Sequence, residues 1–214
     1  MERDKAYSVI IQALGCLYKR DKNLFCNNEK NYERAIAFRL AHYIANIIED
    51  DRQYDPSLSV DSEYERHIES PKACFDGCST CLNGTCFITT ERLAILNARK
   101  KARVDASETE TELIKEVGVR PDIIVHERKT KTNFMVIEVK SPNNNELTER
   151  PDIIDAAKLT YMTCPRPEES KKYHYDLGIA LCVVKDKAKI WTFIDGENQG
   201  SFTVPFMVNN TESL

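Results

Sequence analysis

The segment RPDIIVHERKTKTNFMVIEVK, residues 120–140, determines the central part of the fold. Residues 121–127 and 134–140 have the length and the β-branched composition of strands, and the basic, polar residues between them predict a hairpin tip. The second strand carries apolar side chains on both of its faces, which is typical of a strand in the middle of a sheet. The hairpin is therefore expected to lie inside a larger sheet.

Glu138 and Lys140 interrupt the apolar pattern of this second strand, and because side chains alternate along a strand, both project from the same face. A charged pair on a buried strand costs free energy unless it is paired or binds a metal. Asp122, near the start of the neighbouring strand, is expected to meet the pair across the hairpin. Carboxylates that hold Mg²⁺ or Mn²⁺ can activate a water and neutralise a phosphate, and a nearby lysine can orient or deprotonate that water or stabilise the negative transition state. A purely structural Glu–Lys pair is the alternative interpretation.

The other elements follow from the spacing of apolar residues and from turn residues. Helices are predicted at residues 4–20, 30–49, 90–102 and 151–163 with a shorter one ending near residue 118, and further strands at residues 57–64, 175–184, 187–194 and 202–208. In the second helix, Ile36, Leu40, Ile44 and Ile47 form the stripe to be buried. Glu33 continues this stripe, so its carboxylate is expected to point towards the sheet, although a first-turn glutamate is also favoured by the helix dipole.

The pentapeptide RPDII occurs twice, at residues 120–124 and again at residues 150–154. The first copy begins a strand, whereas the proline of the second copy suits the first turn of a helix. Only the first copy is expected to build a site.

The composition is that of a single soluble α/β domain spanning residues 1–214, with 42% hydrophobic and 30% charged residues. No apolar run approaches the roughly 18 residues of a membrane span, and the first residues do not resemble a signal peptide, so a cytoplasmic location is expected. The net charge of −4 does not argue for or against nucleic-acid binding, because local basic residues decide contact with phosphates. The candidates are Arg66, Arg99, Lys100, Lys101, Arg128 and Lys158, and solvated surface charge is the alternative for each of them.

Four of the eight cysteines are crowded into an insertion at residues 70–88 with the spacing Cys-x3-Cys-x2-Cys-x4-Cys. Four thiolates this close suit a structural zinc ion or an iron–sulfur cluster. Reduced thiols, or disulfides in an oxidising compartment, are the alternatives. The four residues are Cys74, Cys78, Cys81 and Cys86.

The spacing of Pro121-Asp122, fifteen intervening residues and Glu138-Val139-Lys140 resembles the signature of the PD-(D/E)xK nuclease superfamily. Residues 33–44, 60–66 and 119–126 also resemble a group of largely uncharacterised bacterial members. This chain departs from that group at Glu65, where the group typically has Asn, and in its cysteine insertion. The resemblance implies a restriction-endonuclease-like αβββαβ core, with a mixed central sheet flanked by helices. It also implies that Asp122, Glu138 and a helix glutamate such as Glu33 are metal ligands.

Together these features predict a metal-dependent nuclease in which Asp122, Glu138 and Glu33 hold Mg²⁺ or Mn²⁺ and Lys140 assists the attacking water. DNA is favoured over RNA by the resemblance alone. A non-cleaving nucleic-acid or protein-binding module, and a redox or metal sensor built on the four cysteines, are the alternative functions. The absence of an obvious recognition part in a chain of this size leaves a homodimer or a partner protein open as the source of target recognition.

Overall fold

The structure is a computed structural model that describes residues 1–25, 32–51, 53–62, 73–74, 118–119, 121–128, 130, 132–142, 146–165 and 174–206. Two helices, α1 (Arg3–Arg20) and α2 (Tyr32–Asp50), begin the chain, with a short 3₁₀ turn, η1 (Lys22–Phe25), after α1. None of the helices in these ranges is long and apolar enough to cross a membrane.

The chain then forms a six-stranded mixed sheet with the strand order β1-β4-β5-β6-β7-β8. The strands are β1 (Leu58–Ser62), β4 (Ile123–Glu127), β5 (Asn133–Lys140), β6 (Leu177–Val184), β7 (Lys187–Ile194) and β8 (Glu197–Pro205). β5 and β6 are parallel and are connected through α4 (Ile153–Thr163), whereas the other neighbouring strands are antiparallel. Two short strands, β2 (Ala73–Cys74) and β3 (Gly118–Val119), pair separately.

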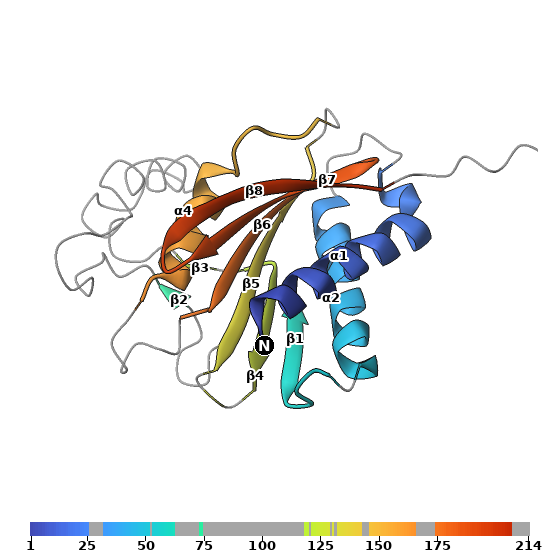
Figure 1. The fold of residues 1–214 in the computed structure, drawn as a ribbon. Helices are drawn as coiled ribbons and strands as arrows, with labels where there is room; N and C mark the ends of the chain where they lie inside the picture. The colour runs from blue at the N-terminus through green and yellow to red at the C-terminus, as the bar shows by residue number, and fades with distance from the viewer. Residues whose placement is uncertain are drawn as a thin grey trace, which may run out of the picture.

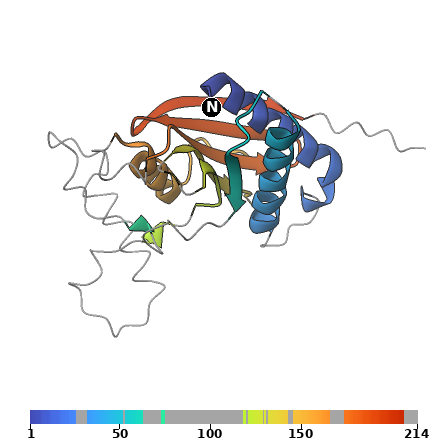
Figure 2. The same cartoon turned by 90° about the horizontal axis from the view of Figure 1, so that it is seen from below.

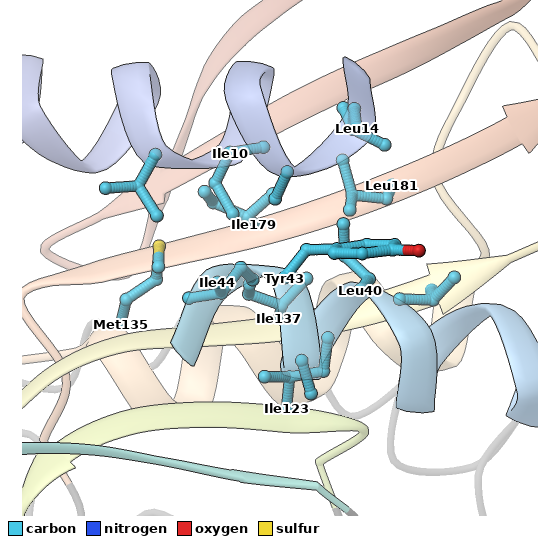
Figure 3. Close-up of a cluster of buried hydrophobic side chains, with 14 of the residues drawn as sticks. Ile10, Leu14, Leu40, Tyr43, Ile44, Ile123, Met135, Ile137, Ile179 and Leu181 are labelled. Atoms are coloured by element: carbon cyan, nitrogen blue, oxygen red, sulfur yellow. The ribbon is translucent and has the colours of Figure 1, made fainter. Parts of the chain in front are cut away.

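The sheet is covered on both faces, with α1 and α2 on one face and α4 on the other (Figures 1 and 2). β5 supplies side chains to both cores in alternation, as predicted. Met135, Ile137 and Val139 pack with α1 and α2 in the larger core, part of which is drawn in Figure 3. Val136 packs with Leu159 of α4 in the smaller core. β5 is therefore an interior strand whose two faces are both needed for folding.

The predicted stripe of α2 is confirmed for Ile36, Leu40 and Ile44, which are fully buried. The next buried position is Ile48, while Ile47 is only partly buried. The reason is geometric. In a helix of 3.6 residues per turn, the fourth residue after Ile44 lies nearer to its face of the helix than the third residue does.

Several strand boundaries differ from the predictions by one to three residues, and the start of β8 differs by more. Asp122 lies one residue before β4, and β8 begins at Glu197, five residues earlier than predicted. The early start of β8 follows from a tight turn at Asp195 and Gly196, whose φ angles are +52° and +80°. An Asp-Gly pair with positive φ is a favoured two-residue hairpin turn, so the strand can begin directly after it. The helix predicted at residues 90–102 lies outside the described residues, as does the shorter helix up to Gly118, which itself belongs to β3.

Close packing of α4 on β6 gives a test of this arrangement. A Cβ atom on Gly178 would lie 3.0 Å from Cγ2 of Thr163 and 3.1 Å from Cβ of Phe193. Overpacking of this kind costs about 2 kcal/mol, so Gly178→Val should lower the melting temperature by about 6 °C in a thermal unfolding experiment. Gly15→Ala, in α1, is the control, because nothing lies within 4 Å of its added Cβ. It should raise the melting temperature by a few degrees, since alanine is the better helix former by about 1 kcal/mol. An unchanged melting temperature in Gly178→Val would contradict the contact between α4 and β6.

Candidate active site

The register of the sheet brings Asp122 and Glu138 together on the face that α4 covers. Ile123 of β4 is paired with Ile137 of β5, so Asp122 stands beside Glu138. The Oδ2 atom of Asp122 accepts a hydrogen bond of 2.7 Å from the backbone N–H of Val139. Asp122 lies just before β4 begins. Its side-chain carboxylate, and not a strand backbone, therefore accepts this N–H of β5. This bond fixes the carboxylate between Glu138 and Lys140.

The first turn of α4 brings a further carboxylate and an ammonium to the same place. Asp152 lies just before the helix and its Oδ1 accepts a hydrogen bond from the backbone N–H of Asp155 at 3.4 Å, which is the N-cap arrangement. Asp155 is directed inwards, with a side chain only 4% exposed, and Lys158 lies one turn further along. The Nζ of Lys158 is 3.0 Å from Oε2 of Glu138 and 3.2 Å from Oδ1 of Asp155.

Lys140, the last residue of β5, joins the helices on the two sides of the sheet. Its Nζ is 3.0 Å from Oε1 of Glu33, in the first turn of α2, and 3.2 Å from Oδ2 of Asp155. Six side chains thus form one charged cluster. They are Glu33, Asp122, Glu138, Lys140, Asp155 and Lys158.

The charged cluster holds four carboxylates against two ammonium groups, so full ionisation leaves two negative charges without a counter-charge inside it. The imbalance is concentrated on Glu138, which is 2% exposed. Its Oε2 meets Lys158, but its Oε1 has no hydrogen-bond partner among the described residues. A buried carboxylate oxygen without a partner is costly, because it has lost its water and gained nothing in return.

Burial accordingly raises the pKa of Glu138 well above its usual range, with the nearby carboxylates adding to this and Lys158 opposing it. Burial also raises the pKa of Asp122, against the lowering effect of the Val139 N–H. For the lysines burial acts in the opposite direction but is outweighed. The carboxylates of Asp155 and Glu33 raise the pKa of Lys140, and those of Glu138 and Asp155 raise the pKa of Lys158. Both lysines are therefore ammonium ions at neutral pH.

The donor set suits a hard divalent cation, but not a site built by protein ligands alone. Among the residues that the structure describes, no group of three or more His, Cys, Asp or Glu side chains is arranged to hold a metal ion. Mg²⁺ does not require such a group, because it is commonly bound through one or two carboxylates together with waters and substrate phosphates. Asp122 and Glu138 meet that lesser requirement, and the partnerless Oε1 of Glu138 is a free oxygen donor.

The four residues predicted to form the catalytic set, Glu33, Asp122, Glu138 and Lys140, lie together. The two predicted contacts to nucleic acid that the structure describes, Arg128 and Lys158, are not grouped in this way. Lys158 lies inside the charged cluster, and Arg128 is paired with Asp61 at 2.5 Å, next to the contact between Asp61 and His126. Arg66, Arg99, Lys100 and Lys101 lie outside the described residues.

The predicted cysteine site is described only at its first member. Cys74 lies in β2, opposite Gly118 of β3. Cys78, Cys81 and Cys86 lie outside the described residues, so a zinc ion or an iron–sulfur cluster there stays a prediction. Of the scattered cysteines, Cys16, Cys164 and Cys182 form no disulfide bond within the described residues.

Asp155 is the member of the charged cluster that sequence reasoning missed, and the reason was the treatment of the second RPDII. Only the last two residues of that copy lie in α4, which begins at Ile153 and not at the predicted Pro151, but the copy leads straight into Asp155, and its Arg150 lines a pocket beside the charged cluster. The expectation that only the first copy builds a site did not consider this position of the second copy next to the charged cluster. The available signal was the i, i+3 spacing of Asp155 and Lys158, which puts an acid and a base on one side of the helix.

The excess negative charge predicts an unusual response to neutralising Glu138. In EDTA at neutral pH, Glu138→Gln should raise the melting temperature by about 4 °C, because it removes a buried carboxylate whose cost is about 1–3 kcal/mol. Since the pKa of Glu138 is raised on folding, its ionisation destabilises the protein increasingly as pH rises above the unfolded-state pKa. The gain should therefore shrink when melting is repeated at acidic pH. Glu49→Gln, an exposed glutamate of α2, should change the melting temperature little at either pH. A Glu138→Gln protein less stable than wild type would show that the pair with Lys158 outweighs the excess charge.

Comparison of the chain with protein-family models, with curated proteins and with solved structures finds no match. What the charged cluster can do has to be judged from its own geometry.

Proposed function

We propose that the chain is a metal-dependent nuclease that hydrolyses phosphodiester bonds, with DNA as its expected substrate. The observation that carries the proposal is the carboxylate pair of the partly buried Asp122 and the buried Glu138, with the Lys140 ammonium at its edge. A site with this charge distribution attracts a divalent cation and presents a cation to a phosphate. The order α2, β1, β4, β5, α4, β6 supports the same proposal, because it agrees with the αβββαβ core of restriction-endonuclease-like nucleases.

In the proposed reaction Asp122 and Glu138 hold Mg²⁺ or Mn²⁺. When bound, the cation supplies a more acidic water and neutralises the phosphate oxygens. Lys158 balances the charge of Glu138 from the side of α4 and fixes the rotamer of its carboxylate.

Lys140 acts in this proposal as an ammonium ion and not as a general base. A base must give up its proton near the working pH, whereas Asp155 and Glu33 raise the pKa of Lys140 above its already high ordinary value. The ammonium donates hydrogen bonds to the attacking water or to a phosphate oxygen and stabilises the charge that develops in the transition state. Glu33 and Asp155 position it for this role.

The proposed location is the cytoplasm, where the thiols of Cys16, Cys164 and Cys182 would stay reduced. A zinc ion or iron–sulfur cluster at the four-cysteine segment would brace the chain and would not take part in the chemistry.

The nuclease activity is tested with purified protein on plasmid and single-stranded DNA, in Mg²⁺, Mn²⁺ or EDTA. Cutting should require the metal, and Glu138→Ala and Lys140→Ala should each lower it by at least about 100-fold, the usual loss when a transition-state contact is removed. Lys19→Ala, an exposed lysine of α1, is the charge-matched control and should cut normally. Cutting that persists in EDTA or in both variants would contradict the proposal. Binding without cutting would favour a non-cleaving module.

Metal binding gives a second test that does not depend on activity. The Mn²⁺ affinity, measured by calorimetry, should rise with pH well above the ordinary carboxyl pKa of about 4, because burial raises the pKa of Glu138 and of Asp122 and protons compete with the metal. Glu138→Gln should bind Mn²⁺ more weakly and with less pH dependence, while Glu49→Gln should behave as wild type. An affinity that is unchanged between acidic and neutral pH would contradict the assignment of these two ligands.

A further inference from the structure

A pocket of about 190 Å³ opens directly beside the charged cluster. Glu138, Lys140 and Asp155 form the wall nearest the cluster. Ala180 and Trp191 form an apolar floor, and Arg150 adds a basic side chain at the rim. The pocket therefore joins the proposed catalytic residues to a largely apolar hollow.

The hollow exists because a small residue stands in the middle of a row across the sheet. Glu138, Ala180 and Trp191 are register partners on β5, β6 and β7. All three face the side of the sheet that α4 covers. The small side chain of Ala180 stands between the carboxylate and the indole at the floor of the pocket, where each of the three residues is at most 4% exposed. At Gly178, two residues earlier on β6, α4 packs tightly through Leu159 and Thr163. The pocket lies where this packing ends, next to the start of the helix.

Positive charge also lies at the rim of the pocket. Arg150 is exposed. Lys189 of β7 has its Nζ 5.2 Å from the centre of the Trp191 ring and 3.3 Å from the carbonyl oxygen of Thr148, another lining residue. A phosphate placed next to the pocket would thus find cations on both sides, Lys140 at the charged cluster and Arg150 or Lys189 at the rim.

An apolar, partly aromatic hollow with cations at both ends matches the chemistry of one nucleotide, whose base is planar and apolar on its faces and whose flanking phosphates are anionic. The volume decides how much nucleic acid fits. Pockets for drug-sized ligands begin at about 300 Å³, so the smaller volume of about 190 Å³ suits a single base better than a base pair. A base inside a duplex reaches such a pocket only after it is unpaired and unstacked, which costs free energy that an unpaired strand does not require.

We infer that this pocket binds one unpaired base adjacent to the scissile phosphate, so that the substrate is single-stranded at the point of cleavage. This inference rests on the proposed nuclease function for its choice of ligand, although base binding can be measured without cleavage. Ala180 and Trp191 form the base site, and Arg150 holds the phosphate on the far side of the base from the charged cluster.

The first experiment measures binding without cleavage, by fluorescence anisotropy of labelled oligonucleotides in EDTA. Wild type should bind a single strand about tenfold more tightly than a blunt duplex of the same length, and Ala180→Leu, which fills the pocket, should lose about that factor on the single strand only, the size expected for one stacked base. Arg150→Ala, on the exposed rim, should weaken binding in a salt-dependent way, whereas Lys19→Ala should not. Circular dichroism verifies that Ala180→Leu is folded.

The second experiment uses only wild-type protein and Mg²⁺, so it does not depend on the folding of a variant. In a single strand with one cleavable phosphate, an abasic nucleotide on one side of that phosphate should slow cleavage about tenfold, and on the other side it should have little effect. Equal binding of single strand and duplex, no effect of Ala180→Leu, or no effect of either abasic nucleotide would overturn the base pocket while leaving a nuclease intact. Single-strand binding that is lost in Ala180→Leu, in a protein that cuts nothing, would support the pocket and overturn the nuclease function.

Discussion

The carboxylate of Glu138, buried in the middle of a sheet, is the constraint on which the rest of the site depends. β5 is an interior strand with both faces covered, so a charge on it is removed from water by the folding of the sheet itself. A carboxylate in such a place needs nearby positive charge. Lys158 supplies that charge from α4, and this ion pair ties the helix to the strand by electrostatics as well as by the apolar contacts of Leu159.

The two lysines do not compensate all of the negative charge in the charged cluster. A structural ion-pair network tends towards neutrality, because every excess charge in a desolvated site raises the free energy of the fold. Here the second lysine, Lys140, is shared between Glu33 and Asp155. Among the residues that the structure describes, this leaves Asp122 with a single backbone N–H and Glu138 with one oxygen that has no partner. Within this part of the chain the site thus keeps a negative charge that the two lysines do not neutralise. That is the arrangement expected where the missing charge is a bound cation, and the opposite of what selection for stability alone would favour.

The parts of this site that could be predicted from the sequence are those governed by local periodicity. Alternation along β5 placed Glu138 and Lys140 on one face, and the apolar stripe of α2 directed Glu33 towards the sheet. What could not be predicted depends on how distant segments align. The inward direction of Asp155 depends on the rotation of α4 about its own axis, which is set by contacts with β6 such as that at Gly178.

The pocket is a still clearer case of long-range alignment, because it exists only where Ala180 and Trp191 come into register with Glu138. Nothing in the local pattern of β6 distinguishes Ala180 from any other small buried residue. The early start of β8, by contrast, was readable from the Asp-Gly pair at residues 195–196 and was overlooked.

The surroundings of Lys140 also limit which chemistry the charged cluster can perform. Two carboxylates within 3.2 Å stabilise its charged form, so the proton is held more firmly than on a free lysine. A lysine activated as a base or nucleophile is found in the reverse setting, in an apolar pocket or beside another cation, where the neutral form is favoured. The same residue type in this sequence position would therefore serve different chemistry if Glu33 and Asp155 were apolar. With them present, the ammonium is a fixed positive charge at the exposed edge of the charged cluster, where an anionic group from solvent can reach it without first entering the buried part of the cluster.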